Sequence, residues 1–268
     1  MTIFILYIIN HSFTQNNSKI METYYYNKIA SDYNSKRNQP WISLGQFLNG
    51  LYKKGYRFNG FCLDLGCGNG RNFKLFKKNM NNRLIGIDNS FEFIKIAQDR
   101  IINSTLFSKI EQNNIQLILG DIKYIPVRAY SVQNIFSIAT IHHIKYNSER
   151  KRVIHQINNL LTKNGYFLLT VWRRWQKKLI KYFIKDWFNR TFKVNYKRYQ
   201  RELELTDFGD KFVPWTVSAE NKTYNRFYHF FSKREIKNLI NRFKMKEFRI
   251  LGGSTNKDNF FILTQKTR

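Results

Sequence analysis

Short apolar runs alternate with longer amphipathic segments from residue 61 onward. The runs are FCLDL at 61–65, RLIGID at 83–88, IQLILG at 115–120, NIFSIAT at 134–140 and GYFLLTVW at 165–172. Runs of this length that alternate with helical segments are typical of βαβ units, whose strands lie parallel in one sheet. The pattern therefore predicts an α/β protein with a mostly parallel sheet and helices on both of its faces.

The helix between the last two runs has the clearest pattern. Ser148 is predicted to cap its start, and Asn164-Gly165 to end it. Between these limits, apolar residues recur at helical spacing, namely Val153, Ile154, Ile157, Leu160 and Leu161.

Two further apolar runs follow near the end of the chain. KEFRIL at 246–251 and NFFILTQ at 259–265 are joined by the glycine-containing segment GGSTNKD. Such a connection is typical of a β-hairpin, so these runs are predicted to add an antiparallel pair to the sheet.

The first twenty residues carry no organised pattern. Their apolar stretch has about half the length that a bilayer span requires, and it lacks the basic start and the cleavage site of a signal peptide. Organised pattern begins after Met21, in ETYYYNKIASDY. We therefore expect residues 1–21 to be a disordered, dispensable or misassigned extension, residues 22–268 to form one domain, and no segment to enter a membrane.

The net charge of the chain indicates the kind of partner that it binds. The chain of 268 residues has 46 Lys and Arg against 18 Asp and Glu, a formal charge of +28. This excess favours a polyanionic partner, and nucleic acid is favoured over an anionic membrane because no basic helix is expected to have a clean apolar face. The charge is dense in a basic and aromatic insert at about 173–223, where eleven Lys/Arg lie between Arg173 and Arg201 against one acid, Asp186.

The two cysteines, Cys62 and Cys67, are too few for a disulfide framework or a zinc site. We therefore predict no bound metal. A reducing setting is expected, which favours the cytoplasm, with the nucleus as an alternative.

The stretch FCLDLGCGNGRN at 61–72 contains the first candidate chemistry. Gly66, Gly68 and Gly70 alternate directly after a predicted strand, so a ligand can approach the main-chain N–H groups closely. A dinucleotide fingerprint needs a different glycine spacing, and Arg71 stands where its third glycine should fall. Asp64 at the end of the strand would repel a pyrophosphate but would suit an ammonium group, so the inferred ligand has a positive end.

Two more acids follow the next strands. Asp88 ends the second strand, where a carboxylate can accept from both hydroxyls of a ribose, and Asp121 follows the third, where it can accept from an adenine amino group beside Ile122. Each acid alone could be an ordinary cap or turn residue. Three acids at successive strand ends favour S-adenosylmethionine over other nucleotides.

With these motifs the chain resembles the class I methyltransferases over residues 58–172 and the final hairpin. The resemblance implies a Rossmann-like sheet of seven strands with the cofactor over the first two. Tyr26 is expected to cover the cofactor. The rest of the predicted cofactor-binding set is Cys67, Asn69, Asn72, Asn89, Ser90, Ala139 and His142.

Five dispersed stretches narrow the resemblance. They are YYYNKIASDYNSKRNQPW at 24–41, IATIHHI at 138–144, FVPW at 212–215, RFYHFFSKREI at 226–236 and DNFFILTQK at 258–266. Together they look like the eukaryotic tRNA wobble-uridine carboxymethyl methyltransferases, and like the methyltransferase domain fused to an AlkB-like oxygenase in animals. Such enzymes esterify the carboxylate of 5-carboxymethyluridine. One departure is Ile144, where the family usually has tryptophan after its paired histidines, so the substrate edge of the site is expected to differ.

The resemblance implies residues that position the substrate. Arg37 or Arg226 could hold the carboxylate or a phosphate through paired hydrogen bonds, and Trp172 or Tyr228 could stack on an extruded base. His143 and His229 complete the candidate set. His143 could equally be a turn residue, and Trp172 and Tyr228 could equally belong to the core.

The partners implied are the anticodon loop of a tRNA and a small zinc-binding activator subunit. The basic insert could clamp the tRNA backbone or be a solvated loop. Two other functions remain open, a methyltransferase for small molecules or proteins and a non-catalytic tRNA-binding paralogue.

Overall fold

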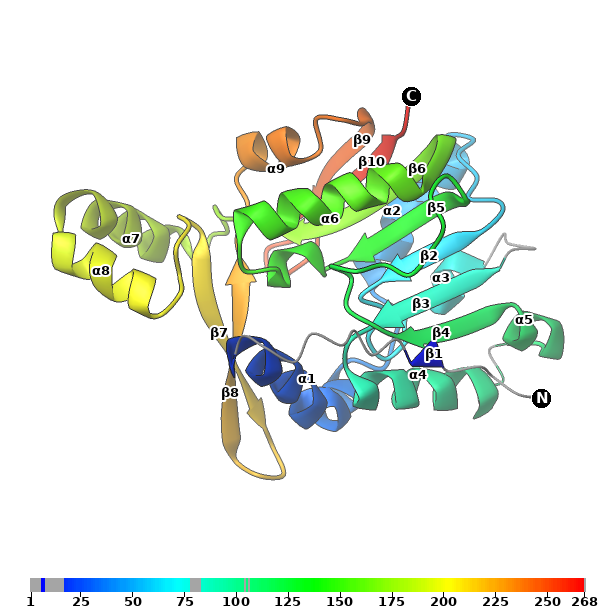
Figure 1. Ribbon diagram of the computed structural model, residues 1–268, viewed down its shortest axis with the longest axis horizontal. Helices are drawn as coiled ribbons and strands as arrows, with labels where there is room; N and C mark the ends of the chain where they lie inside the picture. The colour runs from blue at the N-terminus through cyan, green and yellow to red at the C-terminus, as the bar shows by residue number, and fades with distance from the viewer. Residues whose placement is uncertain (1–5, 8–16, 78–82, 104, 106, 268) are drawn as a thin grey trace.

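The computed structural model describes residues 6–7, 17–77, 83–103, 105 and 107–267 (Figure 1). Its main sheet has the strand order β1-β4-β3-β2-β5-β6-β10-β9. The strands in this order are β1 (Leu6–Tyr7), β4 (Ile115–Leu119), β3 (Leu84–Asp88), β2 (Cys62–Leu65), β5 (Val132–Ile138), β6 (Leu161–Trp172), β10 (Asn259–Gln265) and β9 (Lys244–Leu251).

All neighbours from β1 to β6 pair in parallel, and β10 pairs antiparallel with both β6 and β9. The predicted fold class, a mostly parallel sheet with an antiparallel C-terminal hairpin, is thereby confirmed. The two-residue strand β1 lies beyond the seven predicted strands. It comes from the expected N-terminal extension and pairs with β4 at the edge of the sheet.

Helices cover both faces of the sheet. On one face, α2 (Ile42–Lys53), α3 (Phe73–Lys77) and α4 (Phe91–Asn103) bury their apolar side chains in one core cluster. On the other face, α6 (Asn147–Leu160) and α9 (Lys233–Leu239) contribute to a second cluster. The short helix α5 (Lys109–Asn113) precedes β4.

The predicted limits of α6 need correction. The residue before the helix is Tyr146, whose side chain makes no capping hydrogen bond, and Ser148 lies inside the first turn. At the other end Leu161 already begins β6, because it pairs with Val132 of β5. Asn164 has a positive φ of 64° within β6, where the pairing with β5 shifts its register, so it does not end the helix.

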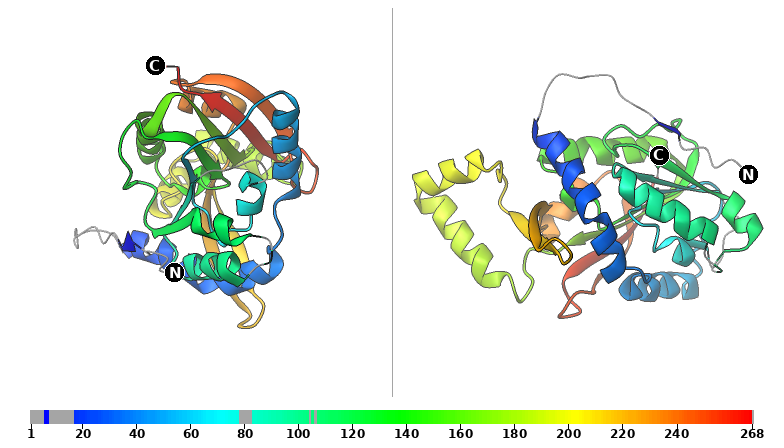
Figure 2. Two further views of the ribbon diagram at one scale, coloured as in Figure 1. Left: turned by 90° about the vertical axis from the view of Figure 1, so that its right-hand side faces the viewer. Right: turned by 90° about the horizontal axis from the view of Figure 1, so that it is seen from below.

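Three elements lie outside the sheet and its covering helices. Helix α1 (Asn17–Lys36) packs against α4 and against a two-stranded ribbon made of β7 (Asp210–Val217) and β8 (Lys222–His229). Helices α7 (Ile180–Phe192) and α8 (Val194–Glu202) form a hairpin that stands away from the sheet (Figure 2). The insert is therefore two helices followed by the ribbon, and the expectation of a solvated loop is wrong.

Asp32 joins α1 to the ribbon. Its carboxylate accepts hydrogen bonds from Trp215 Nε1 at 2.8 Å, from the Ser218 amide at 3.0 Å and from Lys36 Nζ at 2.7 Å. Burial raises the pKa of Asp32, but these hydrogen bonds outweigh it and lower the pKa to about 2. The helix that begins the predicted domain is thus tied to the ribbon at the end of the basic insert.

Candidate active site

A cavity of about 600 Å³ opens where the parallel strands end. Its walls come from the loop after β2, the ends of β3 to β6, helix α1, and the ribbon. Ligands of open α/β sheets bind at this edge of the sheet. The cavity is therefore the candidate active site.

The glycine loop forms the floor of the cavity on the side of β2. Gly66 has φ of 74°, and a Cβ there would lie only 2.2 Å from Thr140 Cγ2, so no side chain fits. Gly68 has φ of 55° and open space where its Cβ would be. A ligand can therefore approach the main chain at Gly68, although the predicted free N–H there donates to Asp88 within the protein.

Asp88 holds this loop in place. Its Oδ2 accepts a hydrogen bond from the Gly68 amide at 2.8 Å, and its Oδ1 accepts from the Ser90 amide at 2.9 Å. Burial raises the pKa of Asp88 to about 6, although these amides lower it in part. Asp88 lines the cavity, so its remaining lone pairs suit the hydroxyl donors of a ribose.

Asp64 lies deeper, one strand away. It is 2% exposed, and its Oδ1 has no hydrogen-bond partner among the described residues. Burial and the neighbouring charge of Asp88 raise the pKa of Asp64 to about 8. A cation in the cavity would stabilise both acids as carboxylates, which fits the ammonium and sulfonium of S-adenosylmethionine.

Other predicted cofactor residues divide into those that face the cavity and those that support it. Asn69 lines the cavity, yet its amide donates to Asn34 Oδ1 at 2.8 Å and to the Arg37 carbonyl at 3.0 Å, which ties the glycine loop to α1. Asn72 accepts from the Trp41 amide at 3.1 Å. The remaining predicted cofactor residues on the wall are Tyr26, Cys67, Asn89, Asp121, Ile122, Ala139 and His142.

Three of the predicted cofactor residues are not on the wall, and the first is Asp64, which lies below it. Ser90 is fully buried, and its hydroxyl accepts from the Phe93 amide at 3.3 Å, so it caps α4. Gly70 has φ of 68°, and a Cβ there would lie 2.8 Å from the Phe73 ring. The predicted contacts of Ser90 and Gly70 with the cofactor are corrected to supporting roles in the loop.

Histidines and aromatic rings form the opposite wall. His142 is 1% exposed and stacks on Tyr228 with ring centroids 5.0 Å apart, while Trp172 lies 4.6 Å from the Tyr228 ring. His143 Nδ1 lies 2.8 Å from Tyr26 Oη and 3.1 Å from the Phe227 carbonyl. Burial and the nearby charge of Arg226 lower the pKa of His143 to about 3, so the ring is neutral at pH 7.

Arg226 stands on this wall with a charge that no acid of the described residues balances. Its guanidinium lies 4.8 Å from the Trp215 ring centroid and 5.1 Å from that of Tyr228. The residue is 8% exposed, its Nε has no hydrogen-bond partner, and it forms no ion pair with any described residue. A buried guanidinium without an acid is costly, so this position is suited to an anion that enters the cavity.

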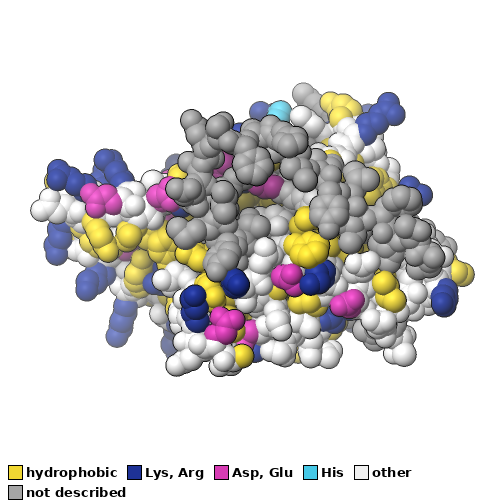
Figure 3. Space-filling view, turned by 60° about the horizontal axis from the view of Figure 1, so that its bottom comes forward, with side chains coloured by type: hydrophobic (Ala, Val, Ile, Leu, Met, Phe, Trp, Pro, Cys, Tyr) yellow, Lys and Arg dark blue, Asp and Glu magenta, His cyan; other side chains and the backbone are white. Residues whose placement is uncertain are grey.

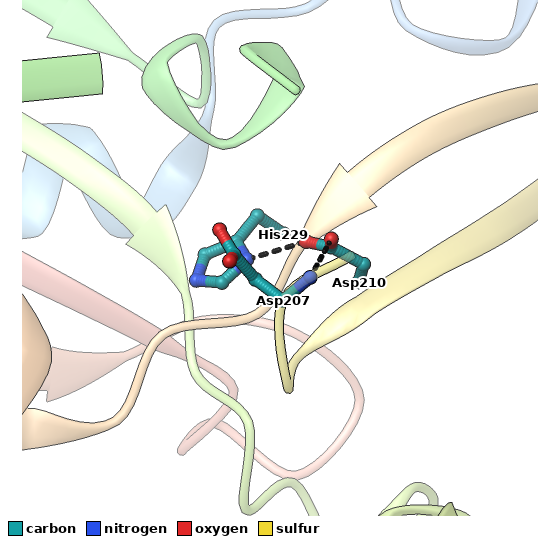
Figure 4. A group of neighbouring side chains, drawn as sticks. All are labelled: Asp207, Asp210 and His229. Atoms are coloured by element: carbon teal, nitrogen blue, oxygen red, sulfur yellow. Dashed lines mark hydrogen bonds and ion pairs between the residues drawn. The ribbon is translucent and has the colours of Figure 1, made fainter. Parts of the chain in front are cut away.

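His229 does not reach the cavity, which corrects its prediction as a substrate-positioning residue. It is fully buried at the base of the ribbon, with Nδ1 2.6 Å from Asp210 Oδ1 and Nε2 2.6 Å from Glu235 Oε1. Asp207 lies beside it and donates its amide to Asp210 Oδ2 at 2.7 Å (Figure 4). Asp207, Asp210 and His229 lie close enough together to bind a metal ion. However, Asp207 already pairs with Arg150, and Glu235 beside His229 already pairs with Arg174.

Several wall residues were not predicted. Tyr33, Trp41, Arg71, Lys178 and Trp215 line the cavity beside the predicted set. Trp41 and Trp215 stand within the stretches that carried the resemblance, so those stretches held the signal. That Trp215 stacks on Arg226 could not be derived, because it depends on the pairing of β7 with β8.

Comparisons with known proteins agree with this geometry. Residues 63–169 match the family model described as a methyltransferase domain. Over 241 residues the chain is 27% identical to the tRNA (carboxymethyluridine(34)-5-O)-methyltransferase of Schizosaccharomyces pombe, with 90% of this chain and 94% of the relative covered. The chain is an S-adenosylmethionine-dependent methyltransferase of class I.

Further relatives extend the comparison of this methyltransferase. It is 26% identical to the tRNA (carboxymethyluridine(34)-5-O)-methyltransferase alkbh8 of Xenopus tropicalis, with 81% of this chain but only 36% of that protein covered. Among solved structures, a DhpI-SAM-HEP complex superposes with a TM-score of 0.63 at 13% identity, covering 94% of this chain and 99% of the other. A SAM-dependent methyltransferase from Methanosarcina mazei superposes with a TM-score of 0.59 at 21% identity, covering 81% of this chain and 97% of the other.

Proposed function

We propose that this methyltransferase transfers a methyl group to the carboxylate of 5-carboxymethyluridine at the wobble position of tRNA. The relatives in Schizosaccharomyces pombe and Xenopus tropicalis bear names with this activity. The observation that carries the proposal is Arg226, a buried guanidinium that faces the cavity and has no acid to balance it among the described residues. An anionic acceptor group supplies the missing charge.

Arg226 suits this role better than Arg37. The carbonyl of Arg37 accepts from Asn69 in the glycine loop, and its guanidinium is exposed and donates to the Lys36 carbonyl at 3.0 Å. Arg37 therefore stands on the cofactor side of the cavity. Arg226 stands among Trp172, Tyr228 and the histidines, where a planar base can stack.

The residues present fit the cofactor. Asp88 and the main chain at Gly68 would hold its ribose and amino-acid portions, Asp64 would stabilise its positive charge from below, and Asp121 with Ile122 would border its adenine. When bound, S-adenosylmethionine supplies an electrophilic methyl group on a sulfonium.

The protein's own contribution is positioning and desolvation. A carboxymethyl acid has a pKa of about 4, so it is ionised at neutral pH and needs no general base. Arg226 can hold it with paired hydrogen bonds, and the rings of Trp172, Tyr228 and Trp215 exclude water around it. The neutral ring of His143 adds no competing positive charge, and its contact with Tyr26 keeps α1 over the site.

Further partners and location complete the proposal. A small zinc-binding activator subunit would cover one edge of the sheet, and the two edges are β9 and the short β1 beside β4. We place the reaction in the cytoplasm, with the nucleus as an alternative site. Among the described residues, no helix is long and apolar enough to cross a bilayer.

The test is nucleoside mass spectrometry of tRNA from cells with and without this chain. We expect the wobble methyl ester to disappear and the free acid or its amide to accumulate. Purified protein, with and without an activator subunit, should then methylate that tRNA with labelled cofactor. Unchanged ester in the deleted cells, or transfer of label to a small molecule or a protein instead, would contradict the proposal. Cofactor binding without any transfer would favour a non-catalytic paralogue.

A further inference from the structure

Helices α7 and α8 form an arm, residues 177–202, that projects away from the main sheet (Figures 1 and 2). Asp186 holds the arm together from inside, because it is 1% exposed and accepts from Arg190 Nε and from Tyr196 Oη, each at 2.8 Å. Arg190 also donates to Gln200 Oε1 at 3.3 Å. This polar network joins the two helices, so the outer apolar side chains are not needed to hold them.

Those outer side chains form an apolar stripe on α7. They recur at helical spacing and are between 39% and 64% exposed: Ile180, Ile184, Trp187, Phe188 and Phe192. The expectation that no basic helix has an apolar face is therefore wrong for α7. Removing such side chains from water is favourable, so a grouped set left exposed indicates a binding surface.

Cations surround the stripe. Of the eleven Lys and Arg between Arg173 and Arg201, Arg174 pairs with Glu235 and Arg190 pairs with Asp186. The others form no ion pair with a described residue, namely Arg173, Lys177, Lys178, Lys181, Lys185, Lys193, Lys197, Arg198 and Arg201. In Figure 3 the projecting end of the molecule shows basic side chains beside hydrophobic ones.

The root of the arm is continuous with the cavity wall. Phe183 of α7 is fully buried and lies in one apolar cluster with Tyr228 and Phe230. Lys178 Nζ lies 5.6 Å from the Trp172 ring centroid, and both residues line the cavity. A polymer with one unit in the cavity therefore has neighbouring units close to the root of the arm.

We infer that the arm binds unpaired RNA next to the nucleotide in the cavity. Trp187, Phe188 and Phe192 stack on bases, while the cations on α7 and α8 contact phosphates. The inference rests on the proposed RNA substrate. RNA fits better than an apolar protein surface because the unpaired cations lie on both helices, and better than a membrane because the stripe begins at the mouth of the substrate cavity.

The test separates stacking from charge with full-length protein and an unmodified tRNA transcript. We expect the double variant Trp187→Ala, Phe188→Ala to raise the dissociation constant about tenfold, with an unchanged dependence on salt, because base stacking is lost. A second variant, with Lys181, Lys185, Lys197 and Arg198 each changed to Gln, should reduce the slope of log affinity against log salt by about 3. Ile110→Ala is the matched control, since Ile110 is 74% exposed on the distant helix α5.

The outcomes are separable from those of the proposed function. The transcript lacks the carboxymethyl group, so its binding does not depend on methyl transfer. Unchanged RNA affinity in the aromatic variant would overturn the inference. The inference would also be overturned if the aromatic variant kept its RNA affinity but lost self-association, or lost binding to vesicles of phosphatidylserine and phosphatidylcholine. If the variants bind RNA more weakly but the intact protein methylates no wobble nucleoside, RNA binding by the arm is supported and the proposed function is contradicted.

Discussion

Arg226 carries a full charge where water hardly reaches it, and the rest of the site is arranged around that fact. Its neighbours are rings and neutral histidines. An arginine kept in this way is stabilised only when an anion joins it, which links substrate binding to the relief of a buried charge.

The first prediction concerns Arg226. Arg226→Met keeps the length and the apolar stem but removes the charge, and kcat/KM for carboxymethylated tRNA should fall roughly 30- to 1,000-fold. Arg226→Lys should recover only part of this, because a lysine cannot make paired hydrogen bonds with a carboxylate. Steady-state kinetics measure the loss, and calorimetry should find the affinity for S-adenosylmethionine within about twofold of the parent protein. If the Met variant kept full activity, another residue would hold the substrate.

The second prediction concerns the pH dependence of cofactor affinity. Because burial raises the pKa of Asp64 to about 8 and of Asp88 to about 6, both gain protons as pH falls from 8 to 5.5. A cationic ligand favours the ionised carboxylates, so affinity should rise with pH over this range, by up to about tenfold per unit for each linked proton. Calorimetry in buffers of different ionisation enthalpy should detect proton release on binding.

The contribution of these two acids to folding stability falls as pH rises, opposite to their effect on cofactor affinity. The folded-state pKa values of these two acids lie above the ordinary value of 3.8, so the folded protein binds more protons than the unfolded chain. Their contribution to stability is present below pH 4 and is lost as pH rises through 6 and 8.

The variant Asp88→Asn tests the second prediction. It should flatten the pH profile of cofactor affinity, and an unaltered profile in that variant would argue against the linkage.

At this scale the sequence predicted much of the cofactor side. The glycines and the acids at the strand ends are local in sequence, and strand ends of a parallel sheet meet at one edge. It could not distinguish Arg226 from Arg37, nor place His229 behind the wall, because those positions depend on how the ribbon packs. A histidine next to two arginine-paired acids leaves no local pattern.

At the scale of elements, the ribbon decides the shape of the substrate side. Its register sets Val213 opposite Arg226 and Pro214 opposite Asn225, which brings two stretches that are separate in sequence into one wall. The predicted strands were found because each is a short run rich in apolar residues that is bounded by polar or turn residues in the sequence. The ribbon was missed because its first strand lies within the basic insert and only part of each strand is buried.

The third prediction concerns the base of that ribbon. Asp210 is fully buried and bonds both the His229 ring and the Asp207 amide. Asp210→Ala leaves these groups without partners, so the free energy of unfolding should fall by about 2–4 kcal/mol. Urea denaturation measures the change. Asp99→Ala on α4 is a surface control that should shift it by less than about 0.5 kcal/mol.

Activity adds a second readout for this variant. Because Asp210 and His229 hold the base of the ribbon that carries Arg226, Asp210→Ala should raise KM for tRNA more than it lowers the affinity for S-adenosylmethionine. If KM for tRNA and the affinity for S-adenosylmethionine worsened by the same factor, the variant would be generally unfolded and the ribbon would not be specifically displaced.

At the scale of the whole molecule, the chain is one sheet whose accessory elements gather at one side of it. Helix α1, the arm and the ribbon all approach the carboxyl edge of the strands (Figure 1). The net charge of +28 predicted a polyanionic partner, and the alternation of strands and helices predicted the fold. The helical form of the insert was not predicted, because its apolar stripe is interrupted by lysines in sequence.

The fourth prediction concerns the boundary of the domain. A chain that starts at Met21 lacks β1 and the first residues of α1, and it should still fold and bind S-adenosylmethionine. The β1 strand forms only two residue pairs with β4, each worth about 0.2–1 kcal/mol, so Tm should fall by no more than about 8 °C. Thermal denaturation with and without cofactor measures this. A truncated chain that aggregated or lost cofactor binding would place residues 1–20 inside the domain.

The glycine loop described above also bears on turnover. Its shape is fixed by amides bonded to Asp88 within the protein itself, and the groups that it can touch are a sugar and an amino acid. Methyl transfer alters neither of these and removes only the sulfonium charge, so we expect S-adenosylhomocysteine to remain bound, but less firmly than the donor. The enzyme would then be inhibited by its own spent cofactor, and its rate would follow how quickly other enzymes clear that product.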